Sequence, residues 1–268
     1  PATPVTVVAT TGNSVYDAAV ADPTILGLLA TATAAEVKQL VNWMRGQDAY
    51  DDDGDCAVGL DLIDPANATN SCITESRPWN FADPLHSRPV AFTFGSELTS
   101  GNPDPTKPVI KMIIGTNDGS VRIINNSTGV EEWAFIPNEL LKNQYKLSQN
   151  NNGDHIYGLD DSPAFLVTDV NNDGIIDPAT DKAYMYIGMR RGVDPATNRG
   201  NIYAFDITPS ATMDEQTDTV TPKLIWVIQG GAGNYAQLGQ TWSRPKVTRI
   251  RATCTPASVC SDGDPFTD

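Results

Sequence analysis

Apolar residues fall in short runs along this chain, and glycine, proline, asparagine and aspartate separate the runs. The runs recur in a fixed order. A strand follows a Ser/Pro segment, an apolar strand ends in glycine, a third strand follows a glycine turn, and a fourth carries tryptophan. One unit occupies residues 87–135, a second occupies residues 161–227, and a third begins at Trp242. Short apolar runs bounded by turn residues predict four antiparallel strands in each unit.

Repeated four-stranded units are typical of β-propeller blades, so the pattern predicts an all-β fold. Two blades and the start of a third cannot close a ring, because propellers usually need about four to eight blades. We therefore expect residues 84–268 to form a partial β-propeller, with the rest of the ring missing. A β-sandwich is the structural alternative.

The N-terminal region, residues 1–83, is expected to lead into this propeller. A short strand is predicted at residues 4–9 and a helix at residues 33–46. Thr33 and Glu36 have the spacing of a capping box at the start of that helix. Four residues at helical spacing supply its apolar face: Val37, Leu40, Val41 and Met44.

Residues 169–177 have the ligand spacing of a calcium-binding loop. Oxygen donors fall at relative positions 1, 3, 5, 7 and 9, and Gly174 at position 6 permits the sharp turn that brings them together. The predicted ligands are four side chains and one backbone carbonyl: Asp169, Asn171, Asp173, Asp177 and the carbonyl of Ile175. Apolar runs on both sides predict that the ion closes a connection between two strands. The alternative is a turn without a metal, because Asn, Asp and Gly favour turns in any case.

Other ion-binding patterns fit less well. Thr180 stands at position 12, where an EF-hand has a bidentate glutamate, and Pro178 prevents a helix from continuing out of the loop. A dockerin carries two such loops on helices, whereas this chain has one loop between strands. The acidic run at residues 51–55 could bind a second ion, but its ligand spacing is poor and a solvated loop is the simpler interpretation.

The four cysteines form two local pairs, Cys56 with Cys72 and Cys254 with Cys260. Neither pair has the spacing of a zinc site. Each pair brackets a polar loop, and the first lies within a long polar excursion at residues 47–83. We predict two disulfides and an oxidising compartment. Four free thiols are the alternative.

The formal net charge of −15 argues against a nucleic-acid partner, because phosphate contacts need clustered Lys and Arg. No run of about 18 apolar residues could span a membrane, so no transmembrane segment is expected. The chain starts at Pro1 without a visible signal peptide and ends in a polar, loop-like segment at residues 262–268. We therefore expect a fragment or a processed region of a longer chain.

Several segments resemble the start of the C-terminal propeller of PilY/PilC-type proteins of bacterial type IV pili. In the family's order they are VNWMRG at 41–46, DPLHSRPV at 83–90, IGTNDG at 114–119, TGVEEWAFIP at 128–137 and GQTWSRP at 239–245. The resemblance implies an exported accessory protein at the pilus tip or outer cell surface, acting in pilus assembly, in opposing retraction and in adhesion. It implies minor pilins or other pilus subunits, and a host or abiotic surface, as partners. The family's calcium loop matches the five ligands predicted above.

Two functions of different classes are compatible with these patterns. The first is a calcium-binding, non-enzymatic pilus protein, and the second is a quinoprotein-like dehydrogenase with pyrroloquinoline quinone and calcium at the propeller axis. The first is favoured because the predicted ligands lie in one loop, whereas an axial cofactor would draw ligands from several blades. His86 and His155 are the only histidines, and a structural role for His86 is the simpler interpretation. Arg190 and Arg191 are either a solvated pair or a docking point for an acidic partner.

Overall fold

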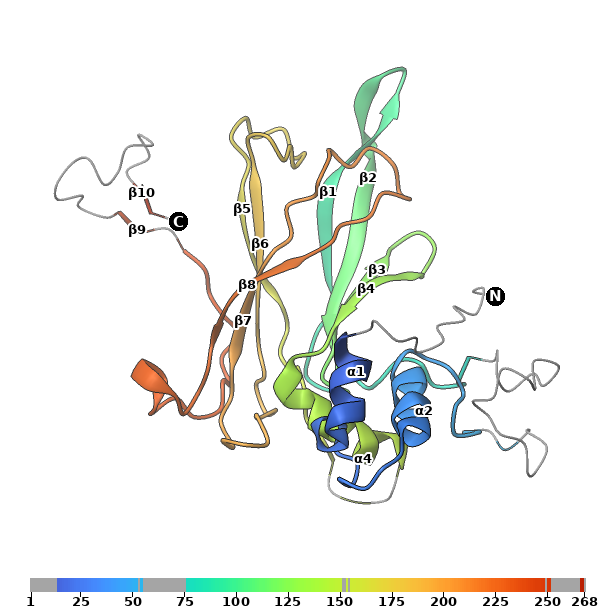
Figure 1. Ribbon diagram of the computed structural model, residues 1–268. Coiled ribbons are helices and arrows are strands. Elements are labelled where there is room, and N and C mark those ends of the chain that lie inside the picture. The colour runs from blue at the N-terminus through green and yellow to red at the C-terminus, as the bar shows by residue number, and fades with distance from the viewer. Residues whose placement is uncertain are drawn as a thin grey trace.

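The computed structural model describes residues 14–52, 54, 76–150, 153, 155–248, 250–251 and 266–267. Within these ranges the chain forms two four-stranded antiparallel sheets side by side, with helices gathered at one end of the first (Figure 1). Sheet 1 contains, in order, β1 (Val90–Thr99), β2 (Asn102–Gly115), β3 (Val121–Asn125) and β4 (Glu131–Phe135). Sheet 2 contains β5 (Ala164–Thr168), β6 (Lys182–Gly188), β7 (Ile202–Asp206) and β8 (Lys223–Ile228).

In both sheets each strand pairs with its neighbour in sequence, which confirms the two predicted four-stranded units. The predicted start of a third unit differs, because residues 241–248 form no strand. A first strand needs a partner to pair with, and the described chain after residue 248 supplies only β9 (Ile250–Arg251) and β10 (Phe266–Thr267), which pair with each other. The two sheets are compatible with two blades, and closure into a propeller stays a prediction.

An apolar core lies between the two sheets. Alternate residues of β6 are buried, as expected of a strand with one covered face: Ala183, Met185 and Ile187. Phe205 of β7 is fully buried and meets the rings of Trp133 and Phe135 of β4 edge to face, with centroid distances of 5.8 and 5.1 Å. Aromatic contacts therefore join the fourth strand of sheet 1 to the third strand of sheet 2.

The N-terminal region is more helical than predicted. The predicted helix is confirmed as α2 (Ala34–Met44), with Thr33 as its N-cap and Glu36 completing the capping box. Four unpredicted helices lie near it: α1 (Ser14–Ala21), η1 (Pro23–Leu26), η3 (Asn138–Asn143) and α4 (Gln144–Ser148). A fifth, η4 (Gly233–Tyr235), follows β8 and was not predicted either. Leu141 of η3 packs in the same core as Leu40 of α2. The chain therefore returns after sheet 1 to cover the N-terminal helices.

Several predictions concern residues outside the described ranges. They include the strand at residues 4–9 and all four cysteines, so both disulfides stay predictions. Most of the excursion at residues 47–83 also lies outside. In the part of the chain that the structure describes, no helix is long and apolar enough to cross a membrane.

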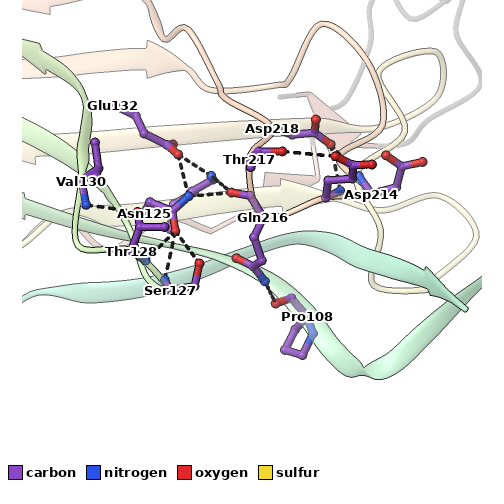
Figure 2. Close-up of polar contacts among 12 residues, drawn as sticks. Pro108, Asn125, Ser127, Thr128, Val130, Glu132, Asp214, Gln216, Thr217 and Asp218 are labelled. Atoms are coloured by element: carbon purple, nitrogen blue, oxygen red, sulfur yellow. Dashed lines mark hydrogen bonds and ion pairs between the residues drawn. The ribbon is translucent and has the colours of Figure 1, made fainter. Parts of the chain in front are cut away.

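The connection between β7 and β8, residues 207–222, contacts sheet 1 through Gln216 (Figure 2). The Gln216 carbonyl accepts hydrogen bonds from Lys111 Nζ at 2.9 Å and Asn125 Nδ2 at 2.6 Å. Its side-chain Nε2 donates to the carbonyl of Pro108 at 2.5 Å. Lys111 is fully buried, and its Nζ also donates to Glu132 Oε1 at 2.7 Å. We term these five residues the Gln216 junction, and it attaches a loop of sheet 2 to three strands of sheet 1.

Candidate functional site

The predicted calcium loop connects β5 to β6, as the sequence indicates. Asn172 and Gly174 have φ angles of 57° and 79°, and these left-handed conformations let the backbone reverse within a few residues. Ile176 anchors the loop, because its side chain is buried and its N–H donates to the carbonyl of Phe94 in β1 at 2.8 Å. The loop is therefore attached to both sheets.

The predicted ligands bind backbone amides of the loop itself. Asp169 Oδ2 accepts a hydrogen bond from the Gly174 N–H at 2.9 Å, and Asp173 Oδ1 accepts one from the Ile175 N–H at 2.8 Å. Asn171 Nδ2 donates to Asp173 Oδ2 at 2.9 Å, which places two predicted ligands side by side. These short-range bonds order the loop as a series of Asx turns.

Asp181 joins the two ends of the loop, and sequence reasoning did not identify it. Its buried carboxylate accepts hydrogen bonds from the N–H groups of Val170 and Asp177, at 3.0 and 2.9 Å. The Thr180 hydroxyl donates to it at 3.0 Å. Hydrogen bonds from the Val170 and Asp177 amides lower the pKa of the Asp181 carboxyl, because they favour its charged form. Its only signal in the sequence is an acidic residue directly before the strand that follows the loop.

The donor set of the loop suits calcium, because hard cations take oxygen ligands. Asp169 Oδ1 is inaccessible to solvent and has no hydrogen-bond partner within the described chain, which is costly for a carboxylate oxygen. In the described ranges, however, no three His, Cys, Asp or Glu side chains lie together as a ready-made metal site. The carboxylates cap amides here, so ligation requires them to turn toward a common centre. The five ligands therefore stay a prediction.

The acidic run is only partly described, since Asp53 and Asp55 lie outside the ranges given above. Asp52 Oδ2 accepts a hydrogen bond from Trp43 Nε1 at 3.3 Å, and the Asp52 N–H donates to Asp48 Oδ1 at 2.8 Å. These contacts hold Asp52 against α2. A second ion at this run stays untested.

Both histidines lie beside carboxylates. His86 Nδ1 is 2.6 Å from Asp160 Oδ2, and the His86 N–H donates to Asp160 Oδ1 at 3.2 Å. Asp160 is fully buried, so this pair links the segment before β1 to the segment before β5. His155 Nε2 is 3.3 Å from Asp83 Oδ2. The His86 contacts agree with a structural role for that residue.

Comparison with known proteins links the chain to type IV pili. No family model and no solved structure matches it. The type IV pilus biogenesis factor PilY1 of Pseudomonas aeruginosa (strain UCBPP-PA14) is 29% identical to the chain over 189 residues. The match covers 68% of this chain and 14% of PilY1, so the chain spans a small part of the length of that protein. Over most of its residues the chain is therefore similar to a segment of a type IV pilus biogenesis factor.

Proposed function

We propose that this chain is part of an extracellular, pilus-associated protein that acts in type IV pilus biogenesis. The observation that carries the proposal is the similarity to PilY1 over 189 residues. The two four-stranded sheets support the proposal, because the resemblance to PilY/PilC-type proteins implies four-stranded propeller blades. The role is one of binding and not of catalysis. Minor pilins or other pilus subunits are the proposed partners, and retraction control and surface adhesion are the finer parts of the same proposal.

The proposal includes a calcium ion in the loop of residues 169–177. Bound calcium would supply a positive charge to Asp169, Asp173 and Asp177, whose carboxylates would otherwise repel one another on turning toward a common centre. Ile176 attaches the loop to sheet 1, and Asp181, directly before β6, accepts hydrogen bonds from both ends of the loop. A change of loop conformation on calcium binding would therefore act on the connection between the two sheets. The free energy available for this change is no larger than the difference in calcium-binding free energy between the two conformations.

Calcium is expected to bind the chain at one site and to raise its melting temperature, because a ligand that binds only the folded state stabilises it. The double variant Asp169→Asn/Asp173→Asn is expected to lose both effects. Each asparagine keeps an oxygen that can cap an amide but removes a negative charge. Titration calorimetry and thermal unfolding, in calcium and in chelator, measure the two effects.

Asp104→Asn is the matched control for this experiment. Asp104 Oδ1 accepts the Thr106 N–H at 2.9 Å, as the loop carboxylates do, but Asp104 lies in β2 outside the loop. This variant should bind calcium like the parent chain. If the parent chain binds no calcium, the loop is not a metal site, while the similarity to PilY1 is unaffected.

A chimera of PilY1 tests the pilus role. Replacing the matched segment of PilY1 in P. aeruginosa by the corresponding segment of this chain is expected to preserve surface pili, because the two segments would share one role. Replacing it by a Gly/Ser linker of the same length is the control, and this change should abolish surface pili. Pilin sheared from the cell surface is the measurement. Loss of pilin with a chimera present at normal level would contradict the proposal.

A further inference from the structure

A cavity of about 350 Å³ lies where the segments before β1 and β5 meet. Its lining includes three arginines, two serines and an aspartate: Ser87, Arg88, Asp161, Ser162, Arg190 and Arg244. We term this cavity the arginine pocket. Arg88 and Arg244 hold the same position in the repeated Ser-Arg-Pro segments 87–89 and 243–245. Two of the three guanidinium groups therefore come from equivalent positions of the repeat.

The arginine pocket holds three guanidinium groups and one nearby carboxyl, that of Asp161, whose charged form Arg190 and Arg244 favour. None of the three guanidinium groups forms an ion pair with a carboxylate within the described chain. Arg122, by contrast, pairs with both Asp118 and Glu131. Arg190 Nε is inaccessible to solvent and has no hydrogen-bond partner among the described residues. A buried charged donor without a partner is costly, so a turn of the Arg190 side chain toward an acceptor in the pocket would be favourable.

The backbone around Arg190 is held in an uncommon conformation. Arg190 has a φ angle of 52°, in the left-handed region that non-glycine residues seldom adopt. Thr241 Oγ1 accepts hydrogen bonds from the N–H groups of Met189 and Arg190, at 3.0 and 3.2 Å, and fixes this turn. Arg244 Nη2 donates to the carbonyl of Pro163 at 2.7 Å. Two of the three arginines are therefore positioned by neighbouring segments, and a strained residue that is held in this way is a feature of binding sites.

The serines add neutral donors to the pocket. Ser87 Oγ accepts the Gly115 N–H at 3.1 Å, and Ser162 Oγ accepts the Arg88 N–H at 2.8 Å. The hydroxyl hydrogens of both serines have no acceptor among the described residues and can donate into the pocket. Asp161 Oδ2 is also buried without a hydrogen-bond partner in the described chain, and burial raises the pKa of the Asp161 carboxyl. The lining therefore combines these donors with one carboxyl, that of Asp161, and with the side chains of Leu85 and His86.

We propose that the arginine pocket binds a carboxylate ligand, with the three guanidinium groups around it and the two serine hydroxyls donating to its oxygens. The planar donors of arginine match the two oxygens of a carboxylate. A phosphate dianion is less suitable, because its second negative charge would lie beside Asp161. The carboxylate belongs either to a small free acid or to an acidic segment of a partner protein. This inference does not depend on the proposed pilus role.

Titration of the full chain with succinate tests the pocket. One site is expected by calorimetry. Arg190→Gln should weaken binding about tenfold or more, because it removes a hydrogen bond between two charged groups. Asp161→Asn should tighten binding at neutral pH, because it removes the negative charge that faces the ligand. Arg45→Gln, at the exposed C-terminal end of α2, is the control and should bind succinate like the parent chain.

The outcomes of this titration are distinct. No heat of binding with succinate at millimolar concentrations, or tighter binding of inorganic phosphate than of succinate, would overturn the inference. An oligoglutamate peptide that binds more tightly than succinate identifies an acidic protein segment as the source of the carboxylate, and binding of succinate alone identifies a small acid. The melting temperature shows whether Arg190→Gln is folded. If it is not, Arg88→Gln replaces it, because the Arg88 side chain is exposed and should tolerate the change.

Discussion

Replacing Phe205 by alanine will lower the free energy of unfolding by about 3–5 kcal/mol, the usual cost of removing a fully buried phenylalanine. Phe205 is fully buried between the sheets, where its ring contacts Trp133 and Phe135 edge to face. The substitution removes both ring contacts and leaves a cavity that the rigid strands fill poorly. Urea unfolding followed by circular dichroism and tryptophan fluorescence measures the change.

Leu224→Ala is the matched control for Phe205→Ala. Leu224 pairs with Phe205 in the register of β7 and β8, but its side chain is 44% exposed. Its loss should cost about 1 kcal/mol or less, because an exposed side chain leaves no cavity. Equal losses for the two variants would show that the contact between the sheets does not determine the stability of the chain.

Replacing Lys111 by methionine is expected to cost about 3–5 kcal/mol, the penalty for leaving one partner of a buried ion pair without the other. Lys111 is fully buried, and the Glu132 side chain is only 7% exposed. The Glu132 carboxylate would keep one hydrogen bond, from Asn125 Nδ2 at 2.9 Å, but lose its counter-charge. The carbonyl of Gln216 would also lose one of its two donors. The midpoint of urea unfolding measures the effect.

The double variant Lys111→Met/Glu132→Leu separates charge from packing. It is expected to be more stable than Lys111→Met alone, because no unpaired charge then stays buried and an apolar pair of similar size often replaces an ion pair at little cost. If the two substitutions destabilise the chain additively, the pair does not interact in the way the Gln216 junction implies.

The sheets could be predicted because their signals are local. Short apolar runs and the turn residues between them mark each strand within a few residues, as in β6. The helices beyond α2 could not be predicted in this way. One of them, α4, has only five residues and no side-chain cap. Leu141 and Leu147 pack against the core around α2, far away in sequence, so their burial depends on the tertiary fold.

The candidate sites, too, could be predicted only as far as their signals are local in the sequence. The spacing of oxygen donors in residues 169–177 is visible in the sequence, whereas the role of Asp181 depends on hydrogen bonds that only the folded loop forms. The pair Arg190 and Arg191 could be noticed but not interpreted. In the structure Arg190 lines the arginine pocket, while the Arg191 guanidinium lies 4.5 Å from the centre of the Tyr157 ring. Only the topology brings Arg190 to the other two arginines.

The Gln216 junction has a consequence for the order of folding. The bonds from Lys111 and Asn125 to the Gln216 carbonyl join residues 105 and 91 positions apart. During synthesis from the N-terminus, all four strands of sheet 1 are present long before residue 216 emerges, and Lys111 and Asn125 lack this acceptor until then. Contacts of such high contact order form late, because closing a long loop costs entropy. Sheet 1 therefore reaches its final stability only when the loop of sheet 2 that carries Gln216 has docked on it.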